Sequence, residues 1–243
     1  RADKLGCEWI ATGHYAQVRK AGERFVISRG IDTNKDQSYV LWGLQQSSLQ
    51  RTMYPMGKYH KPEIREMARQ MGFHSLANKP ESYEICFIPD NDYRGFLKRR
   101  VPEIEASLDG GNFILKDGTI VGKHHGYPFY TIGQRKGLVA MGEPYYVTNI
   151  LPETNTVVIG KEEELLDHQM FIRNVNYMKY KQPADGLPVV TKIRYKDPGE
   201  SSVLYPLTAN RASVIFEQPV KSITPGQSAV FYEGEDVVGG GWI

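Results

Sequence analysis

Apolar and polar positions alternate in several ways along the chain, and the first stretch mixes helical and strand patterns. A helix is predicted over Pro62–Met71, because apolar residues recur there at helical spacing and Gly72 ends the pattern. A weaker pattern predicts a second helix from Gln37 to about Leu49. The run Leu5–His14 is typical of a strand that enters a loop. Strands and helices in alternation favour an α/β domain over residues 1–97.

The rest of the chain carries two patterns of β structure. In residues 98–165 closely spaced glycines separate short apolar or aromatic runs, which predicts a small β domain with loops. In residues 166–243 short apolar runs recur about every 8 to 12 residues between prolines, which predicts a β sandwich or barrel. The candidate strands there are Val189–Tyr195, Ser201–Leu207, Ala212–Phe216, Ser228–Tyr232 and Asp236–Trp242.

The composition is that of an ordinary globular protein. Apolar residues make up 40% of the 243 positions and charged residues 24%. No window approaches the roughly 18 consecutive apolar residues of a membrane helix, so a membrane protein is excluded and no membrane partner is expected. The 30 Lys and Arg against 28 Asp and Glu give a net charge of +2, which neither requires nor excludes a nucleic-acid partner.

The chain has two cysteines, too few for a disulfide framework, and this favours a reducing cytosolic compartment. Cys7 precedes Glu8–Ile10 in the presumed core strand and is predicted to be buried. Cys86 stands just before the turn formers Pro89–Asp92, so it is either a small buried side chain or an accessible thiol. A reactive thiol there needs a lowered pKa, because a pKa of about 8.5 leaves only a few per cent thiolate at neutral pH.

Two short polar segments are candidates for ligand binding. Thr12–Tyr15 follows an apolar strand, and the carboxyl ends of such strands bind ligands in open α/β sheets. Gly13 lets the backbone approach a nucleotide closely, although a simple turn explains it equally well. Lys35–Gln37 is either a solvated helix start capped by Asp36, or a contact of Lys35 with phosphate and of Gln37 with a base edge.

Basic residues gather in two later segments. Gly122–Gly126 and Tyr130–Leu138 combine glycines, cations and aromatic rings, which suits RNA contacts but also an ordinary solvated β face. His124–His125 point to opposite faces of a strand, so no metal site is expected. Lys192 and Arg194 alternate along one candidate strand and share a face, either as a common binding surface or as an ordinary polar exterior.

Taken in order, these segments resemble the tRNA-specific 2-thiouridylase family, sulfurtransferases that place sulfur at C2 of the wobble uridine of tRNA. The matching segments are Ala11–Ala16, Lys35–Tyr39, Ile85–Ile88, Gly122–Gly126, Tyr130–Leu138, Lys192–Tyr195 and Thr224–Val230. The resemblance implies an α/β plus all-β chain. The implied domains are part of a PP-loop (adenine nucleotide alpha hydrolase-like) ATP pyrophosphatase domain in residues 1–97, a small central tRNA-contacting domain in residues 98–165 and a carboxyl-terminal β-barrel in residues 166–243.

The resemblance also implies roles for particular residues. Gly13 matches the ATP site, with Mg²⁺ at the phosphates, and Cys86 matches the cysteine that carries a persulfide. The residues matched to tRNA contacts are His14, Lys35, Asp36, Gln37, Arg194, Tyr195 and Gln227. In the implied chemistry ATP adenylates the C2 oxygen, sulfur arrives on Cys86, and a second cysteine completes its release. Cys7 lies too close to Thr12 to match that second cysteine.

The family implies a cytoplasmic enzyme acting on tRNAs for Lys, Glu and Gln, with a cysteine desulfurase or a sulfur-relay protein as donor. The Ser-Gly-Gly-x-Asp-Ser type PP-loop and the first catalytic cysteine are not among these residues, so we expect an amino-terminally truncated chain that is inactive alone. Three alternatives remain open at this stage: a non-catalytic RNA-binding module, another PP-loop enzyme, and a redox protein that uses Cys7 and Cys86.

Overall fold

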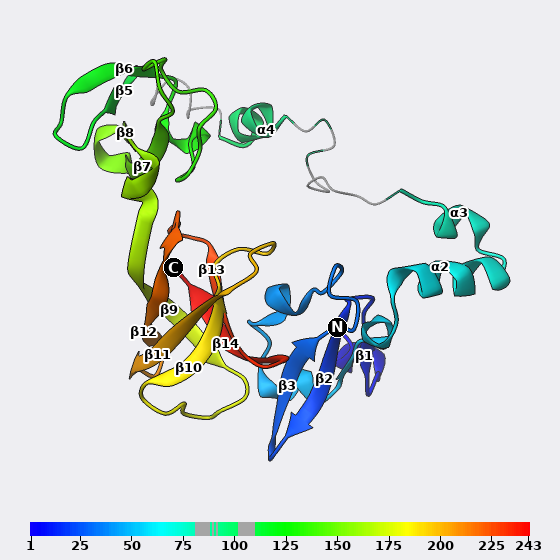
Figure 1. The fold of residues 1–243 in the computed structure, drawn as a ribbon. Coiled ribbons are helices and arrows are strands. Elements are labelled where there is room, and N and C mark those ends of the chain that lie inside the picture. Colours follow the sequence, from blue (N-terminus) through cyan, green and yellow to red (C-terminus); the bar gives the residue numbers. More distant parts are fainter. Residues whose placement is uncertain (81–87, 89, 91, 102–109) are drawn as a thin grey trace. The chain divides into compact units, whose positions relative to one another are not determined.

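The computed structural model describes residues 1–80, 88, 90, 92–101 and 110–243. Cys86 and its neighbours Ile85 and Phe87 lie outside the described residues. The chain divides into two compact units (Figure 1). Unit 1 comprises Arg1–Lys79, His168–Gln218 and Pro225–Ile243, and unit 2 comprises Pro80–Asp167 and Pro219–Thr224. The described part of the chain holds no helix with the length and apolarity that a membrane crossing requires.

A closed barrel of six strands forms the centre of unit 1. Its strands are β9 (Leu166–Tyr177), β10 (Leu187–Lys192), β11 (Glu200–Thr208), β12 (Arg211–Lys221), β13 (Ser228–Glu233) and β14 (Asp236–Trp242). They are ordered β13-β10-β11-β12-β9-β14, and the pairing of β13 with β14 closes the ring. The expectation of a sandwich or barrel is therefore resolved as a barrel, and closure leaves the ring without a free edge.

Two details of the barrel differ from the sequence prediction. Strand β9 was missed, because its buried positions Met170, Ile172 and Val175 do not alternate cleanly with polar ones. Strand β10 ends at Lys192, so Arg194 does not share a strand face with it and lies with Tyr195 in the following turn. The carboxylate of Asp197 accepts the Ile193 N–H at 3.1 Å and the Gly199 N–H at 3.0 Å, which holds this segment as a turn.

A hairpin from the start of the chain extends the barrel sheet. Strands β2 (Ala16–Ala21) and β3 (Arg24–Arg29) pair antiparallel, and β3 joins β14 through Ser28 opposite Asp236. Figure 1 shows this hairpin, in blue, beside the barrel. The shared core consists of Ala16, Val26, Ile27, Tyr39, Leu41, Trp42, Leu49, Tyr54, Met178, Val230, Tyr232 and Val237. Residues between Ala16 and Tyr54 therefore pack onto the barrel, and the first 79 residues belong to the same unit.

The helices of unit 1 only partly match the prediction. Helix α2 (Lys61–Gln70) confirms the pattern over Pro62–Met71. The predicted helix from Gln37 to Leu49 is wrong, because that stretch forms a 3₁₀ turn (Ser38–Leu41) and one α turn, α1 (Gln46–Leu49). An amphipathic helix buries side chains on one side only. This segment buries side chains on more than one side, namely Ser38, Tyr39, Leu41 and Trp42.

The short elements around α2 complete the described part of residues 1–79. They are the 3₁₀ turns Asp3–Leu5 and Pro55–Lys58, the parallel strand pair β1 (Ile10–Ala11) and β4 (Thr52–Met53), and α3 (His74–Ala77). The strand expected over Leu5–His14 is thus limited to two residues. Cys7 lies before it and is exposed, so the prediction that Cys7 is buried in a core strand is wrong.

Unit 2 is a small β structure, as the glycine pattern predicted. Its sheet has the order β6-β5-β8-β7, with β5 and β8 parallel. The strands are β5 (Gly111–Ile114), β6 (Ile120–His124), β7 (Tyr146–Leu151) and β8 (Thr156–Gly160); α4 (Tyr93–Arg100) and the 3₁₀ turns Tyr127–Phe129, Pro152–Thr154 and Glu162–Leu165 accompany them. His124 is buried beside Phe113 and Tyr130, whereas His125 is exposed, so the two histidines do face opposite sides.

Candidate nucleic-acid interface

Two loops named by the sequence analysis are fastened together in unit 1. The side-chain Oε1 of Gln37 accepts the Tyr15 N–H at 3.1 Å, and the Gln37 N–H donates to the Tyr15 carbonyl at 2.8 Å. His14 is adjacent, with its Nδ1 at 2.9 Å from the Thr12 hydroxyl and its ring centre 6.0 Å from that of Tyr54, to which it packs edge-on. The structure therefore brings His14 and Gln37 into one surface region.

Asp36 organises the second of these loops. Its Oδ1 accepts the N–H groups of Gly30 and Ser38 at 3.1 Å each, and its Oδ2 accepts the Ser38 hydroxyl at 2.8 Å. The Ser38 hydroxyl in turn lies 3.0 Å from the hydroxyl of Tyr232. Both carboxylate oxygens are thus engaged within the chain. The N-cap of the turn Ser38–Leu41 is Gln37, so Asp36 holds the loop by local turn bonds and not as the helix cap that the sequence suggested.

Tyr195 brings the turn after β10 to the same region. Its side chain is 41% exposed, and its ring packs edge-on against buried Tyr39 at 6.1 Å. Burial raises the pKa of Tyr195, the charge of Asp36 raises it further and the charge of Lys35 lowers it, so these two charges act on the phenol. Lys35, Asp36 and Tyr195 are therefore close neighbours, although about 160 residues separate them in sequence.

Tyr39 also connects this region to the start of β13. Its hydroxyl donates to the Ser228 carbonyl at 2.7 Å, and Gln227 is the exposed residue just before. Burial and the charge of Asp197 raise the pKa of Tyr39 to about 12, so the phenol stays protonated as a hydrogen-bond donor. We call the residues around this point the loop surface of unit 1. Its members are the exposed residues Arg194, Tyr195 and Gln227 and the half-buried residues His14, Lys35 and Gln37.

Gly13 lies beside the loop surface and is exposed. A Cβ atom built at this position meets no other atom within 4 Å, so the backbone is open to a close ligand. The open backbone at Gly13 fits an adenine nucleotide sterically. In the described ranges, no group of three or more His, Cys, Asp and Glu side chains is placed to hold a metal ion.

Sequence reasoning missed two residues that lie next to the loop surface. Arg29, the last residue of β3, places its guanidinium carbon 4.5 Å from the ring centre of Tyr232. The two residues are about 200 positions apart, so no local pattern indicates that they meet. No local sequence pattern reveals this contact, because the pairing of β3 with the barrel strand β14 creates it.

The glycine-rich basic segment of unit 2 is fixed by Gln134. Its Oε1 accepts the Thr131 N–H at 3.1 Å, and its Nε2 donates to the Lys136 carbonyl at 2.9 Å. Arg135 and Lys136 are exposed on the loop that these bonds hold. The arrangement can present two cations to a polyanion.

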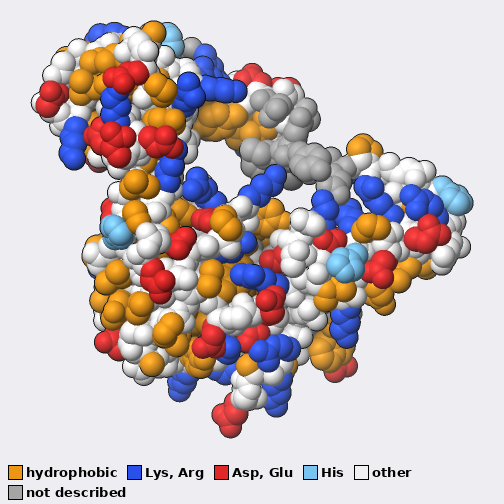
Figure 2. Space-filling view, viewed as in Figure 1, with side chains coloured by type: hydrophobic (Ala, Val, Ile, Leu, Met, Phe, Trp, Pro, Cys, Tyr) orange, Lys and Arg blue, Asp and Glu red, His pale blue; other side chains and the backbone are white. Residues whose placement is uncertain are grey.

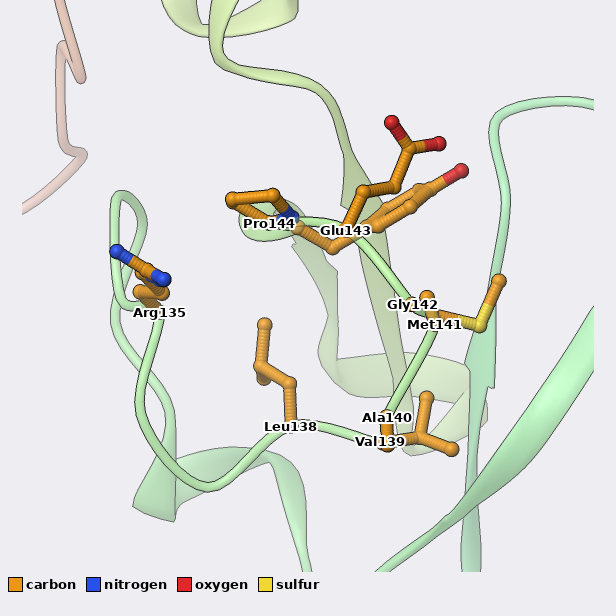
Figure 3. A pocket seen from close by; sticks show the side chains of 9 residues that line it. Arg135, Leu138, Val139, Ala140, Met141, Gly142, Glu143 and Pro144 are labelled. Carbon is orange, nitrogen blue, oxygen red and sulfur yellow. The ribbon is translucent and has the colours of Figure 1, made fainter.

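A shallow pocket of about 330 Å³ adjoins this segment. It is lined by Arg135 and by Leu138–Tyr145, and Figure 3 shows Leu138 on one side facing Pro144 and Glu143 on the other. On the face in Figure 2, acidic and basic side chains are interspersed, as the small net charge requires. Local geometry rather than bulk charge must therefore carry any recognition of nucleic acid.

Comparisons with known proteins cover the whole chain. The tRNA methyl transferase HUP domain model matches residues 1–90, the tRNA methyl transferase PRC-barrel domain model matches residues 94–161, and the aminomethyltransferase beta-barrel domain model matches residues 167–243. The α/β plus all-β organisation is thereby confirmed.

Relatives match over the same length. The chain is 57% identical to the tRNA-specific 2-thiouridylase MnmA of Cytophaga hutchinsonii, over 100% of this chain and 66% of that protein. It is 57% identical to the MnmA of Amoebophilus asiaticus, over 100% of this chain and 65% of that protein. It is 43% identical to the MnmA of Clostridium acetobutylicum, over 100% of this chain and 68% of that protein. The chain thus spans about two thirds of the length of these relatives.

Proposed function

Because this chain belongs to the tRNA-specific 2-thiouridylase family, we propose that the full-length protein catalyses the ATP-dependent 2-thiolation of the wobble uridine in tRNA. The observation that carries the proposal is the loop surface of unit 1. Three separate segments, around His14–Gln37, Tyr195 and Gln227, converge there through hydrogen bonds and ring contacts. Exposed Arg194 and half-buried Lys35 lie near the exposed ring of Tyr195, and cations beside an aromatic ring are what single-stranded RNA contacts use.

Each residue of the loop surface has a role suited to its chemistry. Lys35 and Arg194 neutralise backbone phosphates, and Tyr195 stacks on an unpaired base. His14 and Gln227 supply hydrogen bonds to RNA. Asp36 and Gln37 contact tRNA through the loop that they shape, because their side chains already bond within the chain.

The proposed chemistry has two steps. In the first, the C2 oxygen of the uridine attacks the α-phosphate of ATP, a C2–O–P linkage forms and pyrophosphate leaves. In the second, the terminal sulfur of a persulfide on Cys86 attacks C2 and AMP leaves with the oxygen. The S–S bond to Cys86 breaks when a second cysteine attacks and forms a disulfide, or when that cysteine first releases the sulfur as hydrosulfide. Cys7, exposed and outside the loop surface, takes no part.

ATP is proposed to bind with its adenylate close to Gly13, whose surroundings are open. Mg²⁺ lowers the charge on the phosphates, and it is held mainly by the phosphates themselves. The sulfur comes from a cysteine desulfurase or a sulfur-relay protein, the tRNAs are those for Lys, Glu and Gln, and the setting is the cytoplasm. The Ser-Gly-Gly-x-Asp-Ser type motif is not among the 243 residues, and we propose that these residues alone do not thiolate tRNA.

The test incubates the full-length protein with ATP, Mg²⁺, a cysteine desulfurase, cysteine and unmodified tRNA, and measures 2-thiouridine by nucleoside mass spectrometry. The wild type and Cys7→Ser are expected to form product, and Cys86→Ser is expected to form none. Absence of product from the wild type with tRNA still bound would favour a non-catalytic RNA-binding module. Equal product from Cys86→Ser would keep the enzyme and remove Cys86 from the chemistry.

A further inference from the structure

Two cations from opposite ends of the sequence share one aromatic ring in unit 1. The guanidinium carbon of Arg29 lies 4.5 Å from the ring centre of Tyr232, and the ammonium of Lys192 lies 6.0 Å from it. Tyr232 is fully buried, and its hydroxyl lies 3.0 Å from that of Ser38. The ring is therefore rigid, and it fixes where both charges sit.

Neither cation has an acidic partner among the residues that the structure describes. No ion pair joins Arg29 or Lys192 to a described carboxylate, and the Nε of Arg29 is buried without a hydrogen bond. The charges of Asp36 and Asp197 act on Lys192, but each of these carboxylates already accepts two backbone N–H groups. The Nε of Arg29 is buried, so the donors left for an external acceptor are the terminal guanidinium nitrogens of Arg29 and the ammonium of Lys192, both on half-buried side chains.

The two positive charges also oppose each other. Burial lowers the pKa of Lys192, and the charge of Arg29 lowers it further. The charges of Asp36 and Asp197 offset part of this repulsion, and an anion bound between the two cations would offset more of it. A tetrahedral oxyanion suits this pair, because a guanidinium binds two oxygens side by side and an ammonium binds a third as a point charge.

We propose that Arg29 and Lys192 form a phosphate-binding site that holds one backbone phosphodiester of the bound RNA. The inference rests on the proposed function, since it takes tRNA as the ligand. Tyr195 and Arg194 follow Lys192 within three residues and are exposed, so a nucleotide whose phosphate occupies the site has an aromatic ring and a further cation within reach. The phosphates of ATP share the same chemistry, and the test separates the two sources.

The test measures binding of an unmodified tRNA transcript to the full-length protein across a range of salt concentrations. Arg29→Met and Lys192→Met keep the length of the side chain and remove its charge. Each is expected to weaken binding about tenfold at low salt. Each is also expected to reduce the slope of log affinity against log salt by about 0.7 to 0.9, the contribution of one phosphate contact.

Two further variants control this measurement. Lys20→Met removes an exposed charge from the same hairpin and is expected to change neither the affinity nor the salt slope. Arg29→Lys keeps the charge and is expected to retain the wild-type slope. Thermal unfolding of every variant is compared with that of the wild type. If Arg29→Met does not fold, Lys192→Met provides the test, because Lys192 lies at the end of a strand.

Four outcomes would overturn the proposal in distinguishable ways. Weaker binding with an unchanged salt slope would show that the pair only supports the fold. Loss of ATP binding with tRNA binding intact would assign the site to a nucleotide phosphate. A wild-type protein that binds no tRNA would remove the proposed function as well. Binding weakened by Arg194→Ala but by neither Arg29→Met nor Lys192→Met would leave the proposed function standing and remove this site.

Discussion

Gln37 and Tyr15 hold each other by two hydrogen bonds, one from the Tyr15 N–H to the Gln37 side chain and one from the Gln37 N–H to the Tyr15 carbonyl. The residues are 22 positions apart, so these bonds fix the loop of Lys35 against the loop of His14. A surface that is already ordered loses less conformational freedom when a ligand binds. The pair therefore orders the loop surface in advance of any ligand.

Replacing Gln37 separates this structural role from contact with RNA. Gln37→Ala removes the side-chain bond and is expected to lower the free energy of unfolding by about 1 kcal/mol and to weaken tRNA binding. Gln37→Glu keeps an acceptor for the Tyr15 N–H, so its stability is expected to lie closer to the wild type, while its added negative charge weakens tRNA binding. Urea unfolding and tRNA titration check both. Wild-type tRNA affinity in both variants would contradict a role for this loop.

Tyr195 is expected to contribute through its ring rather than its hydroxyl. Tyr195→Ala removes a stacking surface and is expected to weaken tRNA binding by about 1–3 kcal/mol. Tyr195→Phe keeps the ring and its edge contact with Tyr39, so it is expected to bind within about twofold of the wild type. Equilibrium binding of tRNA to both variants is the measurement. Equal losses in the two variants would assign the effect to the hydroxyl instead.

Asp236 is expected to be important for the stability of unit 1. It is 2% exposed, pairs with Arg19 and Lys179, and accepts the Ser28 hydroxyl at 2.8 Å. Asp236→Asn leaves Arg19 without its counter-charge, while Lys179 keeps Glu233. The change is expected to lower the free energy of unfolding by about 2 kcal/mol, a value reduced because Arg19 is half exposed. Urea unfolding measures it, with Asp185→Asn as an exposed control expected to change little.

The same carboxylate predicts a pH dependence. Burial raises the pKa of Asp236, but hydrogen bonds from Arg19, Lys179 and Ser28 outweigh burial and hold the pKa below its usual value of 3.8. A carboxyl whose pKa is lower in the folded state stabilises the fold above the unfolded pKa, and this stabilisation is lost as the pH falls through the folded pKa. The difference in free energy of unfolding between the wild type and Asp236→Asn is therefore expected to be constant near neutral pH and to shrink below about pH 4. A difference that grows on acidification would contradict this account.

His124 predicts a pH dependence of the same sign in unit 2, at a higher pH. Burial lowers its pKa from the usual 6.5, and its Nδ1 accepts the Gly126 N–H at 3.0 Å. The unfolded chain therefore binds a proton more readily, so the stability of unit 2 is expected to fall as the pH drops below about 6.5. His124→Asn keeps an acceptor but does not titrate, and its stability is expected to be flat in this range. An NMR titration of the His124 ring that gives a pKa above 6.5 would exclude this explanation.

The sequence was sufficient where a local pattern decides the structure. Helix α2 follows from apolar spacing within ten residues, and β14 has the predicted bounds Asp236–Trp242. The prediction from the sequence failed between Gln37 and Leu49, where tertiary contacts decide the backbone conformation. The Trp42 indole N–H donates to the Ser228 hydroxyl at 3.0 Å, and Tyr39 bonds the carbonyl of the same residue. Both contacts come from the far end of the chain and prevent a continuous helix.

The same limit applies to the candidate site. Motifs identified His14, Lys35 and Tyr195 one by one, and their standing as tRNA contacts remains a prediction. Their proximity follows from barrel closure and from the contacts of Tyr39 with Tyr195 and Ser228, which the motif Lys35–Tyr39 does not reveal. The Arg29 and Tyr232 contact is of the same kind, since two polar residues of unrelated segments meet only after β3 joins β14.

The pairing of β3 with β14 has a consequence for how the protein is made. Arg19 and Asp236 are 217 positions apart, so the amino-terminal hairpin is synthesised long before its partner strand. Contacts of such long sequence separation form slowly, whereas unit 2 is built from strands between residues 111 and 160 and has its partners at hand. Unit 2 can therefore fold while translation continues. The hairpin must wait until β14 leaves the ribosome, and until then its apolar residues are exposed to chaperones or to misassembly.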